Sequence, residues 1–329
     1  MEQPLVSIII PVYGVEHFIT KCLTSVFNQT YGALEIIIID DATQDRSIEL
    51  AKQLLNEYPN RANSTVFIKH EVNLGLPSAR NTGLKNAGGI YVMHIDSDDW
   101  IENDMVEKMV ESAISKDLDI VYSDWFLSFR KNERYMKQPS FIDPKECIDA
   151  FLNGSLRFNV WNKLVKRSIY LENNILFPDG KPMGEDMTMI KVFCHARSIG
   201  YVPGAFYHYV QLNPNAYTKQ FSEEKFLQVV ENTNNVVEYI ETRFPDGGYS
   251  RQVHFFKLNV KLPLLIGSDV NKYAFWKTVF SESNVYIKEN KAFGWRIKLV
   301  QLAALNAQYW LVKLHYFIII KFIYGFVYR

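Results

Sequence analysis

The stretch Ile90-Tyr91-Val92-Met93-His94-Ile95-Asp96-Ser97-Asp98-Asp99 joins a predicted buried strand, residues 90–95, to a cluster of three aspartates. At about 4 Å, two like charges repel by ~1 kcal/mol in water and by about 4 kcal/mol near a protein surface, so the cluster needs compensation. A hard divalent cation, held by one or two carboxylates and by substrate phosphates, supplies it. The alternative is a polar loop in which one aspartate caps the helix predicted from Glu102. The position of the cluster at a strand end favours the metal site.

Alternating strands and helices surround this stretch through the first third of the chain. The other predicted strands are the short apolar runs Leu5–Ile10, Glu35–Ile39, Val66–Lys69 and Asp119–Ser123. The predicted helices are His17–Asn28, Asp45–Glu57, a helix that begins at Pro77, and Glu102–Ser115. Nearly continuous apolar strands separated by helices indicate an α/β fold with a parallel sheet covered on both faces. Ligands of such open sheets bind outside the carboxyl ends of the strands.

Polar residues follow several of the predicted strands at that same edge. Tyr13 comes after the first strand, and Asp40 and Asp41 end the second. An ionised carboxylate there can accept a hydrogen bond from an imide N–H, a group that uracil and thymine possess. The alternative is an N-cap for the following helix, a role that Thr43 or Asp45 can also fill. The strand ends therefore predict one shared ligand-binding crevice.

The segment Asn73-Leu74-Gly75-Leu76-Pro77-Ser78-Ala79-Arg80-Asn81 predicts a tight turn followed by a helix. Gly75 permits the turn, and Pro77 suits the first turn of a helix. Arg80 projects from that turn, where a guanidinium can hold a diphosphate through two parallel hydrogen bonds. The alternative for Arg80 is a surface salt bridge.

A pair of acidic residues opens another predicted helix, in the sequence Gly184-Glu185-Asp186. A carboxylate in a substrate crevice can act as a general base toward a hydroxyl group. Acidic residues are also favoured in the first turn of any helix. The pair therefore gains a catalytic interpretation only together with the other motifs.

The composition is that of an ordinary globular protein. Of 329 residues, 48% are hydrophobic and 22% are charged, which is far more apolar than a disordered chain. Thirty-six basic residues balance thirty-six acidic ones, so the net charge gives no signal of nucleic-acid binding. Cys22, Cys147 and Cys194 lie far apart and predict neither a disulfide framework nor a zinc site. Residues 1–12 predict a first strand instead of a signal peptide, which favours a cytoplasmic location.

The second half of the chain becomes helical after a mixed segment. Residues 125–210 combine short strands with a helix at Pro144–Asn153, and further helices are predicted at Glu223–Phe244 and Gln252–Ile266. From about Ala292 we expect one last helix, which is strongly apolar and aromatic.

The apolar part of this last helix runs from Tyr309 to Tyr328 and contains two lysines. A spanning helix needs about 20 mostly apolar residues, but each lysine near the bilayer centre costs about 2.5–3.5 kcal/mol. A helix in the membrane interface lets the lysines reach lipid phosphates while aromatic residues insert. The alternatives are a helix packed on its own domain and a spanning helix. The residues concerned are Lys313, Lys321, Trp310, Phe317 and Phe322, with nearby Arg296, Lys298 and Arg329.

Taken in order, these motifs resemble the inverting family-2 glycosyltransferases with the GT-A fold, of the bacterial surface-polysaccharide type. The resemblance extends from about Leu5 to Tyr209 and implies a mostly parallel central sheet flanked by helices. It implies a catalytic domain at residues 1–215, with a nucleotide-sugar half (1–124) and an acceptor half (125–215), and a helical region at 216–329. The motifs are Val6-Ser7-Ile8-Ile9-Ile10-Pro11-Val12-Tyr13, Glu35–Asp41, Asn73–Asn81, Asp96–Asp99, Trp161-Asn162-Lys163 and Glu185-Asp186.

The resemblance implies a nucleotide-sugar site. Pro11, Val12 and Tyr13 would frame the nucleoside, and Asp41 would read the uracil N–H with Asp40 beside it. The residues implied at the diphosphate are Arg80, Asp96, Ser97 and Asp98.

The resemblance also implies a divalent metal, Mn²⁺ or Mg²⁺, and a catalytic base. Asp98, Asp99 and Asp96 are the metal-ligand candidates, and the sequence leaves open which of them bind directly. His208 is a further candidate, although a lone histidine between aromatic residues is more often a packed core residue. The catalytic residues implied are Asp186, as the general base of an inverting transfer, and Glu185, its neighbour near the acceptor.

The expected reaction moves one sugar from a nucleotide-diphosphate sugar, such as a UDP-sugar, to a hydroxyl of a glycan or polyprenyl-diphosphate-linked acceptor at the inner face of the cell membrane. The Gln-x-x-Arg-Trp motif of processive relatives is absent, which favours single-sugar addition. Asp41-Ala42-Thr43 replaces the more usual Asp-Gly-Ser and leaves the choice of nucleotide open. One alternative is a nucleotidyltransferase, but Pro11–Gly14 stands where its glycine-rich phosphate loop would be. The other is an inactive sugar-binding relative, which would lack Asp186 or the aspartate cluster.

Overall fold

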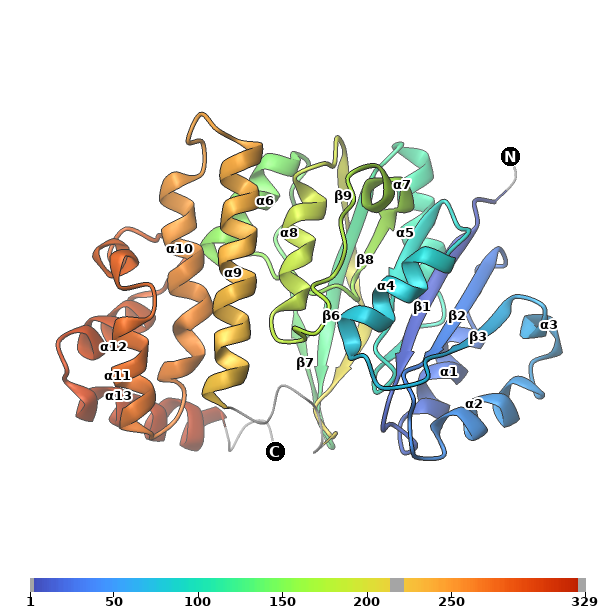
Figure 1. Cartoon of the computed structure of the whole chain (residues 1–329), viewed down its shortest axis with the longest axis horizontal. Coiled ribbons are helices and arrows are strands. Elements are labelled where there is room, and N and C mark those ends of the chain that lie inside the picture. Colours follow the sequence, from blue (N-terminus) through green and yellow to red (C-terminus); the bar gives the residue numbers. More distant parts are fainter. Residues whose placement is uncertain (1–2, 214–221, 325–329) are drawn as a thin grey trace.

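The computed structural model describes residues 3–213 and 222–324, and within them the chain forms a sheet of nine strands covered by helices (Figure 1). The strand order is β3-β2-β1-β4-β8-β6-β9-β5, and β7 pairs with β6 at the side of this path. The strands are β1 (Val6–Val12), β2 (Leu34–Asp40), β3 (Thr65–Lys69), β4 (Tyr91–His94), β5 (Trp100–Ile101), β6 (Ile120–Ser128), β7 (Glu133–Met136), β8 (Lys163–Lys166) and β9 (Ile199–Val210).

The amino-terminal half of the sheet is parallel, as predicted. β1 pairs in parallel with both β2 and β4, and β2 pairs in parallel with β3. The register places Val12 beside Asp40 and Asp40 beside Lys69, so the carboxyl ends of these strands share one edge. Beyond β4 the sheet becomes mixed, because β8 lies antiparallel between β4 and β6, while β6 and β9 are parallel.

The isoleucines of β1 and β2 bury both faces of the sheet. Ile8 and Ile36 belong to one hydrophobic cluster, whereas Ile9 and Ile37 belong to another on the opposite face, as the two-residue period of a strand requires. Helix α4 lies so close to β1 that a Cβ on Gly83 would come within 2.3 Å of the Ile9 side chain. The helices of this half are α1 (Ile19–Phe27), α2 (Ser47–Leu55), α3 (Pro59–Ala62), α4 (Leu76–Asn86) and α5 (Met105–Ser115).

Of two helices predicted from the sequence, one has the predicted boundaries and the other begins later than predicted. The Pro144–Asn153 helix (α6) is confirmed, with Asp143 accepting a hydrogen bond from the Lys145 amide at its start and left-handed Gly154 at its end. The predicted helix from Glu102 begins only at Met105, because Trp100 and Ile101 first form β5 against β9. Short helical segments follow at α7 (Arg167–Glu172), η1 (Glu185–Met187) and α8 (Thr188–Phe193).

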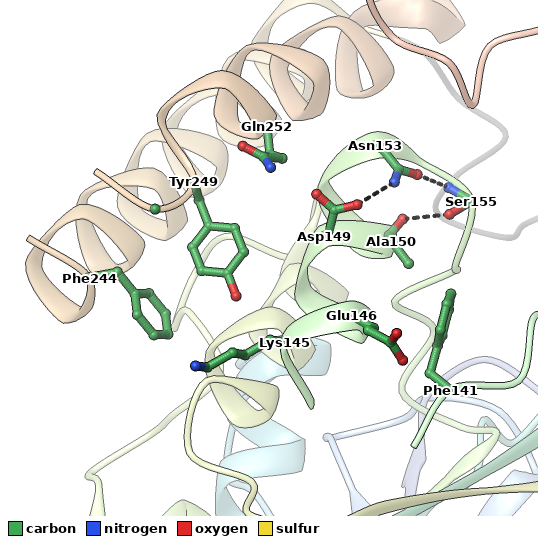
Figure 2. Close-up of a pocket in the computed structure, with 11 residues that line it drawn as sticks. Phe141, Lys145, Glu146, Asp149, Ala150, Asn153, Ser155, Phe244, Tyr249 and Gln252 are labelled. Atoms are coloured by element: carbon green, nitrogen blue, oxygen red, sulfur yellow. Dashed lines mark hydrogen bonds between the residues drawn. The ribbon is translucent and has the colours of Figure 1, made fainter. Parts of the chain in front are cut away.

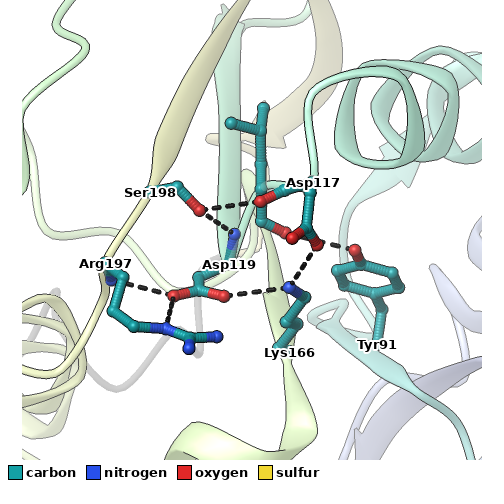
Figure 3. A network of polar contacts seen from close by, with 7 residues as sticks. Tyr91, Asp117, Asp119, Lys166, Arg197 and Ser198 are labelled. Carbon is teal, nitrogen blue, oxygen red and sulfur yellow. Dashed lines mark hydrogen bonds and ion pairs between the residues drawn. The ribbon is translucent and has the colours of Figure 1, made fainter.

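A network of polar contacts joins β4, β6, β8 and β9 near the amino end of β6 (Figure 3). The carboxylate of Asp119 accepts hydrogen bonds from Lys166 Nζ at 3.0 Å and from the Arg197 backbone amide at 2.8 Å. The Tyr91 hydroxyl donates to the Leu118 carbonyl at 3.1 Å. The network fixes the strands at the edge opposite to the predicted crevice.

The carboxyl-terminal helices gather at one end of the molecule, away from β3 (Figure 1). The prediction of one continuous helix from Ala292 is wrong, because the helical segments are interrupted at Asn306–Gln308, where Ala307 has a left-handed φ of 55°. The segments are α9 (Glu223–Arg243), α10 (Ser250–Lys261), η3 (Leu262–Leu265), α11 (Val270–Thr278), η4 (Ser281–Tyr286), α12 (Trp295–Leu305), α13 (Tyr309–His315) and η5 (Tyr316–Tyr324).

The last helices pack partly on the domain. Val300, Ala304 and Val312 are buried in the larger hydrophobic cluster, whereas Trp310 and Phe322 are 65% and 73% exposed. Residues 325–329, with Arg329 at the end of the predicted apolar helix, lie outside the described residues, as does the predicted domain boundary at 215/216. Across residues 3–213 and 222–324, no helix combines the length and apolarity that crossing a bilayer requires.

Candidate active site

The carboxyl ends of β1 and β2 carry the residues predicted to meet the nucleoside. Pro11 and Val12 are buried within β1, whereas Tyr13, directly after the strand, is 53% exposed. Asp40 ends β2, is buried, and accepts a hydrogen bond from the Thr43 amide at 3.0 Å. Of these residues, Tyr13 therefore has the exposed side chain, while the others are buried at the strand ends.

Asp41 organises the loop that leads into α4. Its carboxylate accepts hydrogen bonds from His70 Nδ1 at 2.7 Å and from the amides of Leu74 at 2.9 Å and Gly75 at 2.8 Å. The next residue, Ala42, has a φ of 56°, a left-handed conformation that costs less for glycine. This explains physically why glycine is the more usual residue at this position.

The aspartate cluster after β4 divides into a buried member and two partly exposed members. Asp99 is 1% exposed and accepts hydrogen bonds from the Tyr207 hydroxyl at 2.6 Å and the Val210 amide at 2.7 Å. The Tyr207 hydroxyl also accepts one from the Asp96 amide at 3.2 Å. Burial, with Asp98 and Asp96 nearby, raises the pKa of Asp99 well above its usual range. Asp99 therefore holds the loop, whereas Asp96 and Asp98 are partly exposed; Ser97 between them is buried.

The Arg80 side chain extends from α4 into the protein interior and is not exposed on the surface. Its side chain is 2% exposed, with Nη2 2.7 Å from Asp96 Oδ1 and Nη1 2.5 Å from Glu185 Oε1. The contact with Glu185 is a close ion pair without good hydrogen-bond geometry at Nη1. Burial alone would lower the pKa of Arg80, but Glu185 and Asp96 outweigh it and raise the pKa. The guanidinium thus bridges the aspartate cluster and the acidic pair at the start of η1.

The acidic pair itself consists of a buried and a partly exposed carboxylate. Glu185 is 7% exposed, and burial raises its pKa although Arg80 opposes the shift. Burial also raises the pKa of Asp186 to about 6, against the influence of Arg80 and Lys163. A partly exposed carboxylate whose pKa lies near neutrality is suited to accept a proton.

Lys163 is a site residue that the sequence did not reveal, beyond its place in Trp161-Asn162-Lys163. It is 1% exposed, and its ammonium donates to Asn162 Oδ1 at 2.9 Å and to the Arg157 carbonyl at 3.1 Å. Burial lowers its pKa to about 7, an effect that Cys147 and Asp186 oppose. A lysine so buried holds the loop before β8 in place and adds positive charge near Asp186.

The residues present fit a divalent cation only in part. Among the described residues, no group of three or more His, Cys, Asp and Glu side chains is arranged to hold a metal ion. Asp99 already uses both oxygens, whereas Asp98 and Asp96 are partly exposed. Two carboxylates plus substrate phosphates match the way Mg²⁺ is usually bound.

His208 is not brought together with the aspartates. Its Nε2 lies 2.9 Å from Glu102 Oε1, its Nδ1 lies 2.8 Å from Glu133 Oε1, and its ring stacks on Trp100 at 3.4 Å. Both ring nitrogens are therefore engaged within a packed aromatic cluster. This is the core-histidine arrangement that the sequence alternative described.

Comparison with known proteins identifies the family of the chain. The sequence profile of "Glycosyl transferase family 2" matches residues 7–183. EpsH of Bacillus subtilis, a glycosyltransferase by its given name, is 35% identical over 217 residues, which cover 64% of this chain and 61% of EpsH. The glycosyltransferase GlyA of Streptococcus pneumoniae is 31% identical over 218 residues, covering 62% and 30%. The matched region thus spans less than two thirds of the length of these relatives.

Solved structures resemble the chain over nearly its whole length. The structure of S. aureus TarS 1-349 in complex with UDP-GlcNAc superimposes with a TM-score of 0.66 at 18% identity, covering 95% of this chain and 91% of that one. The mannosyltransferase PcManGT from Pyrobaculum calidifontis, in complex with GDP-Man and Mn²⁺, gives a TM-score of 0.54 at 14% identity, covering 97% and 88%. The predicted GT-A fold is thereby confirmed. Because the family profile covers more than half of the chain, the protein belongs to glycosyl transferase family 2.

Proposed function

We propose that the chain is an inverting glycosyltransferase that moves a single sugar from a nucleotide-diphosphate sugar to a hydroxyl of a glycan or lipid-linked acceptor. The observation that carries the proposal is the Arg80 bridge, which joins Asp96 on the donor side to Glu185 beside Asp186. The bridge supports the proposal because it connects an aspartate of the proposed diphosphate site to the acidic pair that contains the proposed proton acceptor. The family membership supports the reaction class.

In the proposed reaction, Asp186 takes the proton of the acceptor hydroxyl. The acceptor oxygen then bonds to the anomeric carbon as the bond from that carbon to the diphosphate breaks on the opposite face, which inverts the configuration. Glu185 does not share this role, because its carboxylate is paired with Arg80. Tyr13 is exposed where the nucleoside would lie, and UDP-GlcNAc in TarS supports a UDP-sugar as donor.

Asp98 and Asp96 are the residues that we propose hold a divalent cation with the donor diphosphate. Such a cation supplies positive charge to the departing diphosphate. Support comes from the partly exposed carboxylates and from the Mn²⁺ in the PcManGT structure. Asp99 orders the loop through Tyr207, and His208 is not part of the proposed site.

The test is nucleotide release from a panel of UDP-, GDP- and dTDP-sugars in the presence of Mn²⁺, repeated with EDTA and after Mn²⁺ or Mg²⁺ is restored. We expect one donor class to be turned over, turnover to stop on chelation, and the metal to restore it. If no donor in the panel releases its nucleotide, the transferase proposal is contradicted. Full activity in excess EDTA would contradict the proposed metal dependence.

We further propose that the acceptor belongs to cell-surface polysaccharide synthesis and lies at the inner face of the cell membrane. A relative from Bacillus spizizenii, 31% identical over 212 residues, is named a poly(ribitol-phosphate) beta-glucosyltransferase. Trp310 and Phe322 are exposed aromatic residues, and in the sequence they stand close to Lys313 and Lys321, respectively. Such a surface suits insertion into the interface of an anionic bilayer.

Membrane attachment is tested by substitution and not by truncation, because removal of residues after 292 would also remove Val300, Ala304 and Val312 from the core. Lys313→Glu with Lys321→Glu should weaken binding to anionic vesicles at least tenfold in a salt-dependent way, since each basic residue contributes about 1 kcal/mol. Co-sedimentation measures binding, with the exposed-residue change Val285→Ala as the control. Unchanged vesicle binding, or none by the unaltered protein, would exclude this surface as the anchor.

A further inference from the structure

A cavity of about 660 Å³ lies between α6 and the turn that joins α9 to α10 (Figure 2). Its size falls within the ~300–1,000 Å³ that small-molecule sites occupy. None of its lining residues belongs to the candidate active site. In Figure 1 the α9–α10 turn lies at the top of the view, whereas β1, which Tyr13 follows, ends toward the bottom.

Aromatic rings form part of the cavity wall. Phe244 and Tyr249, from the α9–α10 turn, pack edge to face with ring centroids 5.0 Å apart. Phe141 lies across the cavity from them, beyond α6, and the Tyr249 hydroxyl points toward the space between (Figure 2). Burial, with Cys194 and Asp149 nearby, raises the pKa of Tyr249 to about 12, so the hydroxyl remains a hydrogen-bond donor at neutral pH.

Planar polar groups line the rest of the cavity. Glu146 and Asp149 project from α6, and Gln252 projects from α10 (Figure 2). Asn153 Nδ2 donates to Asp149 Oδ2 at 3.0 Å, which fixes the orientation of that carboxylate. Carboxylates and amides offer two oxygens, or an oxygen and an NH₂ group, to neighbouring partners.

We infer that this cavity is a second carbohydrate-binding site, which holds a distal part of the glycan acceptor. A sugar ring presents an apolar C–H face that packs on aromatic rings, and hydroxyls that donate to carboxylates and accept from amide or phenol groups. Lys145 lines the same cavity as Glu146 and Asp149, and its positive charge offsets one of their two negative charges. Because no residue that lines the cavity belongs to the active site, an acceptor that reaches both contains more than one sugar. This inference rests on the proposed transferase function for the identity of the glycan, but not for its binding.

The test uses a glycan array of short and long bacterial surface-polysaccharide fragments with the unaltered protein and two variants. We expect long fragments to bind, and the double change Glu146→Gln with Asp149→Asn, as well as Tyr249→Ala, to weaken that binding by about tenfold or more. Ile142→Ala is the matched control, because Ile142 is 84% exposed and does not line the cavity. The carboxylate-to-amide changes preserve shape, so they distinguish recognition from misfolding if Tyr249→Ala is unstable.

Nucleotide release from the donor panel is measured on the same samples. We expect it to be unchanged in the cavity variants, since the cavity contains no residue of the active site. Glycan binding without any nucleotide release would contradict the transferase proposal but would still support the carbohydrate-binding site in the cavity. The cavity site would be overturned by any of three results. These are equal binding by the variants and the control, no binding of the unaltered protein to the array, and preferential binding of spermine over glycans.

Discussion

Replacement of Asp186 by Asn lowers the turnover number about 10²-fold or more while nucleotide-sugar binding persists. Asparagine keeps the size of the side chain and its hydrogen-bonding capacity, but it cannot accept the acceptor proton. Turnover is followed by nucleotide release, and donor binding by calorimetry. The exposed Asp246, changed to Asn, serves as the control. Turnover within a few-fold of the unaltered enzyme would exclude Asp186 as the base.

The pKa of Asp186 also predicts how turnover depends on pH. Its pKa of about 6 lies above the ordinary aspartate value because of burial, so turnover should fall as the pH drops through about 6. A folded-state pKa above the unfolded value means that the carboxyl stabilises the fold only at low pH, and that this contribution is lost as the pH rises through about 6. The Asn variant should therefore be at least as stable as the unaltered protein at neutral pH, by thermal unfolding.

Replacement of Arg80 by Met lowers the free energy of unfolding by about 3–5 kcal/mol, because it leaves Asp96 and Glu185 without their buried cation. Denaturation in urea measures the loss. Arg80→Lys should recover only part of it, since one ammonium cannot replace a fork that reaches two carboxylates. Adding Glu185→Gln to Arg80→Met should recover part as well, because it removes one of the two unpaired charges.

The control for Arg80 is Arg46→Met, which breaks the exposed pair with Glu49 and should leave the free energy of unfolding nearly unchanged. The sequence had suggested that Arg80 clamps the diphosphate. That role would instead give an Arg80→Met protein of unchanged stability with weakened donor binding. The two readouts therefore distinguish a buried bridge from a diphosphate clamp.

Local patterns were sufficient for much of the fold. The alternation of isoleucines along β1 and β2 supports burial on both faces, and the acidic cluster follows β4 as the run Ile90–Ile95 predicted. The helix predicted at Pro144–Asn153 is confirmed as α6, with Asp143 and Gly154 at its ends. These signals are readable because each depends on residues that are neighbours in the chain.

Two features could not be predicted from the sequence: the antiparallel position of β8 in the sheet and the break in the helix at Ala307. β8 pairs with β4 and β6, and nothing in its short apolar run specifies the direction of a partner. The chain around Ala307 was apolar enough to predict one helix, yet Ala307 adopts a left-handed conformation that ends α12, and Val300 before it and Val312 after it are buried in the same cluster.

The sequence by itself determined the order of the longer strands and helices in the first third of the chain, the edge of the sheet where polar residues gather, and the acidic pair at residues 185 and 186. Tertiary structure alone decided what each charged residue does there. Asp99 became the buried support of its loop because Tyr207 and Val210 come from β9, and Arg80 became a bridge because Glu185 comes from a distant segment. Spacing along a chain fixes which residues can share a helix face or a strand end, but the burial and pairing of a charge depend on partners that only the folded chain brings within reach.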